Sequence, residues 1–128
     1  MLEGPMRLLL RAEDAALFGA SLLVFHALDI SWWMFAVLCL APDIAFVFYL
    51  SGPRAGALAN NMMHSTIGPI ALGSVGWWLG LDILGTILAG CAAIWMAHVG
   101  FDRMLGYGLK YASGFHDTHL GRIGRNRN

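Results

Sequence analysis

The feature that most constrains this chain is a series of four long apolar stretches, joined by short polar connections, that fill most of its 128 residues. They run over about 5–28, 32–50, 55–79 and 83–105. At about 1.5 Å per helical residue, each is long enough to cross roughly 30 Å of hydrocarbon. A soluble domain of this size could not bury a chain that is 58% hydrophobic and only 12% charged. We therefore expect an all-α membrane protein.

Short connections between long helices favour antiparallel packing of consecutive helices. We expect a four-transmembrane-helix up-and-down bundle in a single domain, residues 1–128, with a Gly-rich C-terminal tail over 106–128. Within the third stretch, Gly68-Pro69 should kink the helix, because proline lacks an N–H group and its ring clashes with the preceding turn. Gly76-xxx-Gly80 in the same stretch permits close helix contact, either within one bundle or between two copies.

The positive charges are segregated along the chain. All of them lie before or within the first stretch, between the second and third, or from the end of the fourth onward: Arg7, Arg11, Arg54, Arg103, Lys110, Arg122, Arg125 and Arg127. The other two connections carry only Asp29 and Asp82. By the positive-inside rule, both termini are cytoplasmic. We expect a multi-pass protein of the bacterial inner (cytoplasmic) membrane, surrounded by membrane lipids and with no nucleic-acid partner.

Ionisable residues recur inside the apolar stretches, where they are costly and usually serve a function. The first stretch carries Glu13, the second Asp43, the third His64, and the fourth His98 and Asp102. Counted from the cytoplasmic ends at the helical rise, Asp43 lies about 14 Å deep and His64 about 15 Å deep. His98 and Asp102 share one helix face at i and i+4. The pattern predicts a single layer of acids and imidazoles.

Carboxylate and imidazole groups that converge in a helical bundle suit a divalent metal such as zinc, manganese or iron. The alternative is a buried hydrogen-bonded network, in which Asp102 accepts from His98 or pairs with Arg103 and ties the helices together. Asp14 is adjacent to Glu13 on its helix and should therefore point elsewhere.

The tail carries a second polar group that could fold back over the mouth of the bundle. We expect His119 to add a metal ligand, and Glu13 or Asp117 to act as general base. Three basic side chains could hold an anionic headgroup or phosphate: Lys110, Arg103 and Arg54.

Three segments resemble an uncharacterised bacterial membrane family, domain-of-unknown-function family number 4260. They are Ala41-Pro42-Asp43, the stretch 95–103 and the stretch 106–121. The resemblance covers nearly the whole chain and implies no established activity.

A weaker likeness concerns the membrane-bound metal-dependent hydrolases. Pro42-Asp43, His64-Ser65 and His98-xxx-Asp102 are similar to the Pro-Asp, Thr-His-Ser and His-xxx-Asp elements of that group. The likeness implies that Asp43, His64, His98 and Asp102 are metal ligands. This chain departs from the pattern at Met63, which replaces the threonine, and at Ile44-Ala45, which replaces a second aspartate.

The leading hypothesis is a metal-dependent hydrolase that acts on a lipid ester or phosphoester near the cytoplasmic headgroups, where a divalent ion would activate water. A second hypothesis keeps the metal and makes it a di-iron-type redox centre, although no Glu-xx-His pair is present. A third is a non-catalytic accessory subunit of a larger membrane complex, or a homo-oligomer, whose polar layer only packs the bundle. A proton path is disfavoured because the acids cluster on one side of the membrane.

Overall fold

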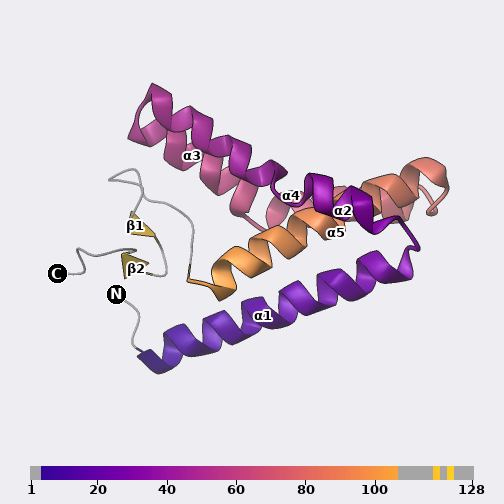
Figure 1. The fold of residues 1–128 in the computed structure, drawn as a ribbon, viewed down its shortest axis with the longest axis horizontal. Coiled ribbons are helices and arrows are strands. Elements are labelled where there is room, and N and C mark those ends of the chain that lie inside the picture. Colours follow the sequence, from indigo (N-terminus) through magenta and orange to yellow (C-terminus); the bar gives the residue numbers. More distant parts are fainter. Residues whose placement is uncertain (1–3, 107–116, 119–120, 123–128) are drawn as a thin grey trace.

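The computed structural model describes residues 4–106, 117–118 and 121–122, and nearly all of this part is helical (Figure 1). The helices are α1 (Gly4–Ala27), α2 (Trp32–Leu38), the 3₁₀-helix η1 (Ala41–Ser51), α3 (Pro53–His64), α4 (Ile67–Trp78) and α5 (Ile83–Met104). Two short strands, β1 (Asp117–Thr118) and β2 (Gly121–Arg122), pair antiparallel in the tail. The predicted helical stretches are confirmed nearly to their ends, but the second and third are each broken in two.

Proline accounts for both breaks. Pro42 has no N–H group, so the α-helical ladder stops, and the next N–H, that of Asp43, donates to the carbonyl of Leu40 at 3.0 Å in a 3₁₀ pattern. In the third stretch, the ring of Pro69 would clash with the carbonyl four residues earlier. That residue is Ser65, which is extended at φ −84° and ψ 159° and ends α3. The predicted kink is thus confirmed as a full break.

The helices do not form a regular up-and-down bundle, because α5 is central (Figure 1). Both α1 and α4 pack along α5, and α1 packs chiefly on α5 rather than on the helix that follows it. Helices η1 and α3 pack against each other as an antiparallel pair, here called the arm (residues 41–64), which diverges from α5. The two proline breaks allow the arm to turn away and leave a fork between it and α5.

Small residues permit the closest helix contacts. A Cβ atom at Gly100 of α5 would lie 2.9–3.0 Å from backbone atoms of α1. A Cβ atom at Gly76 of α4 would lie 2.7 Å from the carbonyl oxygen of Gly85 on α5. Gly80 instead adopts φ 82° and forms the turn between α4 and α5. Of the predicted glycine pair, Gly76 therefore serves packing within one chain.

The described surface is covered by large apolar side chains, while the core is small. The buried cluster consists of Phe25, Ala93 and Ile94. Trp78 is 83% exposed and Leu50 is 90% exposed. Two stretches of the described residues, Trp32–Ser51 and Ile83–Met104, are long and apolar enough to cross a membrane. These apolar helices suggest a membrane protein, but fewer such spans are found than the four expected, since α3 and α4 have only 12 residues each.

Candidate metal centre

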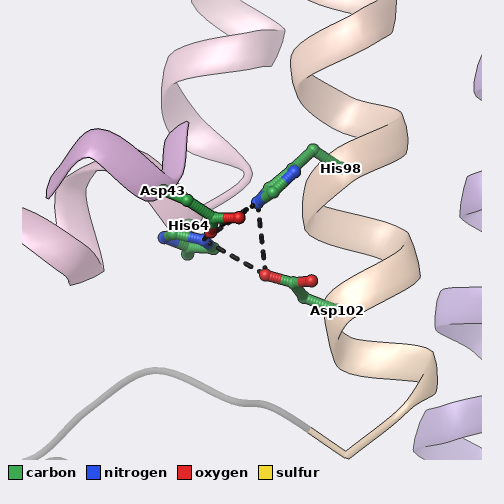
Figure 2. Close-up of side chains that lie close together, drawn as sticks. All are labelled: Asp43, His64, His98 and Asp102. Atoms are coloured by element: carbon green, nitrogen blue, oxygen red, sulfur yellow. Dashed lines mark hydrogen bonds and ion pairs between the residues drawn. The ribbon is translucent and has the colours of Figure 1, made fainter. Parts of the chain in front are cut away.

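Four predicted ligands from three helices meet at the fork between the arm and α5 (Figure 2). Asp43 comes from η1, His64 from the end of α3, and His98 and Asp102 from successive turns of α5. One ligand atom from each residue lies within 4.8 Å of the other three. Of the predicted layer, these four residues form a compact cluster, which lies at the fork and not inside a regular bundle, while Glu13 is not part of it.

The shortest approaches centre on the two imidazoles. The His64 and His98 Nε2 atoms are 3.1 Å apart. Asp43 Oδ1 lies 3.2 Å from the His64 Nε2 and 3.1 Å from the His98 Nε2. Asp102 Oδ2 lies 3.2 Å from both. The four atoms thus surround a single point.

The proline break in the second stretch supplies one support of this cluster. Because the Asp43 N–H donates to Leu40, the carbonyl oxygen of Cys39 is left without its usual helical donor. That oxygen accepts a hydrogen bond from His98 Nδ1. The break that starts η1 with Asp43 in its first turn therefore also orients the imidazole that faces this carboxylate.

The imidazole of His64 is held at the second break. Its Nδ1 lies 3.0 Å from the carbonyl oxygen of Asn60, one turn earlier in α3. The end of α3 is then tied to α5 by two side chains that flank the α5 ligands. Trp95 Nε1 donates to the carbonyl of Met63, and Arg103 donates from Nη2 to the carbonyl of His64 at 3.1 Å.

These hydrogen bonds determine which ring nitrogen faces the centre. A carbonyl oxygen only accepts, so Nδ1 of both His64 and His98 must carry a proton. In a neutral imidazole, Nε2 then presents a lone pair. With both imidazoles neutral, the four converging atoms are two imidazole lone pairs and two carboxylate oxygens, which are all acceptors; a protonated imidazole would instead donate from Nε2 to a carboxylate. A histidine bonded to a carbonyl through one nitrogen commonly holds a metal with the other.

The spacing also fits a metal. Bonds of about 2.0–2.1 Å from a tetrahedral zinc to N and O ligands place neighbouring ligand atoms roughly 3.3 Å apart. Five of the separations among the four atoms are 3.1–3.2 Å. Two imidazoles and two carboxylates also suit manganese or iron. The side chains of His64 and His98 are 7% and 6% exposed, whereas those of Asp43 and Asp102 are 33% and 23% exposed, so the cluster is open on its carboxylate side.

The other predicted site residues divide into three groups. Arg103 lies beside the cluster through its bond to His64. Glu13 and Arg54 are exposed and are not brought to the cluster, since Glu13 points outward from α1 and Arg54 lies in the first turn of α3. Lys110 and His119 lie outside the described residues, and of Asp117 the structure describes only the backbone in β1.

On α1 it is Asp14, and not Glu13, that turns toward α5. Asp14 is half-buried and close enough to Arg103 to interact with it electrostatically. The expectation that Asp14 points elsewhere is thus corrected. Phe18 and Phe25 lie on the same face of α1 as Asp14; Phe18 packs on Phe101 of α5, and Phe25 belongs to the buried cluster. This packing determines which face of α1 is turned toward α5.

A family model described as Domain of unknown function (DUF4260) matches residues 7–123. The match confirms the family resemblance seen in the sequence. No curated protein and no solved structure matches the chain. The likeness to metal-dependent hydrolases therefore stays a prediction, and the geometry of the site carries the functional argument.

Proposed function

We propose that this chain, which belongs to the family described as Domain of unknown function (DUF4260), is a membrane-embedded metal-dependent hydrolase. The family description names no activity, so the proposal rests on the site. The observation that carries the proposal is the convergence of two imidazole nitrogens and two carboxylate oxygens on one point. When the imidazoles are neutral, these four acceptor atoms, all within 4.8 Å of one another, repel unless a cation lies between them. A divalent ion bound there supplies water activation and polarises an ester carbonyl or phosphoryl oxygen.

The chain's own residues have distinct roles in this proposal. The imidazoles of His64 and His98 form the buried wall of the centre, and the partly exposed carboxylates of Asp43 and Asp102 form its open side. The second oxygen of either carboxylate would accept a proton from attacking water. Arg103, one residue after Asp102, is placed to attract an anionic ester. In the tail, we propose Asp117 as a general base and Lys110 as a residue that binds the anionic group of the substrate.

We place the centre near the cytoplasmic headgroups of a bacterial inner membrane, in a chain with four passes. Several features support this orientation. Arg11 Nε donates to the carbonyl of Met104 at 2.7 Å, so the start of α1 and the end of α5 lie together. The turn between η1 and α3 lies at the same end of the molecule, and Arg54 follows it in the first turn of α3 (Figure 1). The exposed tryptophans lie at the opposite end, as an interfacial belt would.

The substrate class follows from the position of the centre. Because the 3₁₀ rise is about 2.0 Å per residue, the nine residues from Asp43 to Gly52 span about 18 Å rather than 14 Å. His64, eleven residues after Pro53, lies about 17 Å from the same end. These lengths run along the arm, which diverges from α5; on α5 itself Asp102 lies only two residues before the last residue of that helix, Met104, so we propose that the centre is shallow. A reactive group at that level is the ester or phosphoester linkage of a membrane lipid.

The test is lipid turnover by the purified, zinc- or manganese-loaded protein in vesicles of defined phospholipids. Mass spectrometry of the products should show a released fatty acid or headgroup, and both chelation and Asp43→Asn should abolish the release. The Asp29→Asn variant, which alters an exposed carboxylate outside the centre, should retain it. Stoichiometric metal without release from any phospholipid tested would contradict hydrolysis of such lipids.

A further inference from the structure

The arm carries an apolar groove that leads to the metal centre. A cavity of about 530 Å³ lies between η1 and α3, and a second of about 200 Å³ lies where α2, η1, α3, α4 and α5 meet. Ala41 and Met63 line both, so the two cavities adjoin. We infer that this groove holds one hydrocarbon chain of a membrane lipid, whose polar linkage reaches the metal centre. The inference rests on the proposed function and names the part of the substrate that the site recognises.

The inner cavity lies beside the ligands, although none of the four lines it. Pro42 and Met63 line it, and each directly precedes a ligand in the sequence: Asp43 on η1 and His64 on α3. On α5 it is lined by Ile94, one turn before His98. On three separate elements, a residue of the cavity wall is therefore followed within one helical turn by a residue of the metal centre.

The lining chemistry fits hydrocarbon. The outer cavity is lined only by apolar side chains: Ala41, Ile44, Ala45, Phe48, Ala55, Leu58, Ala59, Met62 and Met63. At its mouth Ile44 is 67% exposed and Met62 is 65% exposed. In a membrane these side chains face lipid, so a chain enters sideways without crossing water. The unbranched methionines adapt to a flexible alkyl chain.

Polarity changes at the inner end of the groove, where the two carboxylates and Arg103 lie. An amphiphile with an apolar chain and an anionic linkage matches this order. The other large cavity, about 540 Å³ between α1 and α4, does not match it. It is lined on α5 by Ala89, Ala93 and Met96, which lie on the opposite helix face from His98 and Asp102.

The experiment uses dodecyl phosphate with a photoactivatable diazirine on the carbon chain close to the phosphate, incorporated into phosphatidylcholine vesicles that contain the full-length protein. Adducts are mapped by mass spectrometry and scaled to those on Leu84, an exposed residue of α5 that reports bulk lipid. We expect strong labelling of Met63 and Trp95. Ala59→Phe fills the outer cavity and should lower this labelling severalfold. Ala71→Phe, on the exposed face of α4, should leave it unchanged.

Competition in the wild type gives an independent test. Excess unlabelled dodecyl phosphate should remove the Met63 and Trp95 adducts and spare those on Leu84. Equal loss at all three residues, or full labelling in Ala59→Phe, would overturn the groove assignment. Metal content is measured on the same samples. Saturable groove labelling in a wild type that binds no metal would support the chain site and overturn the hydrolase proposal instead.

Discussion

Replacement of Asp43 by asparagine should change the stability of the protein in opposite directions with and without metal. The Asp43 and Asp102 ligand oxygens lie within 4.8 Å of each other. At an effective dielectric constant of about 20, two unit charges at that separation repel by about 3.5 kcal/mol. Partial exposure of both carboxylates reduces this to about 2–3 kcal/mol. Asparagine keeps the shape, removes one charge and can donate to an imidazole lone pair.

The assay is thermal unfolding followed by circular dichroism, in detergent above pH 8, where ordinary imidazoles are neutral. With chelator present, Asp43→Asn should unfold at a temperature about 10 °C above that of the wild type, at roughly 4 °C per kcal/mol. With zinc at about 1,000 times its dissociation constant, the wild type gains about 4.1 kcal/mol, which exceeds the advantage of about 2–3 kcal/mol that the variant has without metal, whereas the variant, which lacks one ligand, gains little. The order of the two proteins should therefore reverse.

A purely structural polar network predicts no reversal. There, Asp43 would be a hydrogen-bond acceptor for protonated imidazoles, and its loss would lower stability equally with and without metal. An equal decrease in both conditions would refute the electrostatic reasoning. Asp29→Asn is the matched control, because it removes an exposed carboxylate in a turn, and its unfolding temperature should follow that of the wild type in both conditions.

Three further predictions follow from the supports of the site and from the topology. Trp95→Phe removes the hydrogen bond to the Met63 carbonyl and should weaken zinc affinity by roughly 10- to 100-fold, measured by competition with a chromophoric chelator; unchanged affinity would mean that this bond does not position the ligand. Gly100→Ala places a Cβ within 2.9–3.0 Å of the α1 backbone and should cost about 1–3 kcal/mol in thermal unfolding, whereas an unaltered unfolding temperature would contradict the close packing of α1 on α5. In a cysteine-free background, Asp82→Cys should react with an impermeant maleimide added to intact cells and Arg54→Cys should not; the reverse pattern would invert the proposed orientation.

The sequence predicted the helical stretches and the four ligands because both depend on local patterns. Apolar runs set the lengths of the helices, and costly polar groups within them mark the site. Pro69 also signalled the break that ends α3 at His64. The four residues of the cluster could be grouped from their expected depth in the membrane, since residues at one depth on different helices are able to meet. Glu13 was grouped with them on the same ground, but it does not join the cluster.

The arm and the supports of the ligands could not be predicted in this way. The stretch 32–50 was expected to be one helix, and the effect of Pro42 on the hydrogen-bond ladder was missed. The role of the Cys39 carbonyl depends on that break. The rotation of α1, which turns Asp14 rather than Glu13 toward α5, is determined by tertiary packing of aromatic side chains. Such packing leaves only a weak sequence pattern in a helix that is apolar on most faces.

Metal content tests the central claim most directly. Elemental analysis of the detergent-purified protein, after reconstitution and removal of free ions, should find one or two divalent ions per chain in the wild type. Asp43→Asn and His98→Ala should each lose the metal while circular dichroism shows that their helices remain. Equal metal in the wild type and both variants, or none in the reconstituted wild type, would contradict the metal centre.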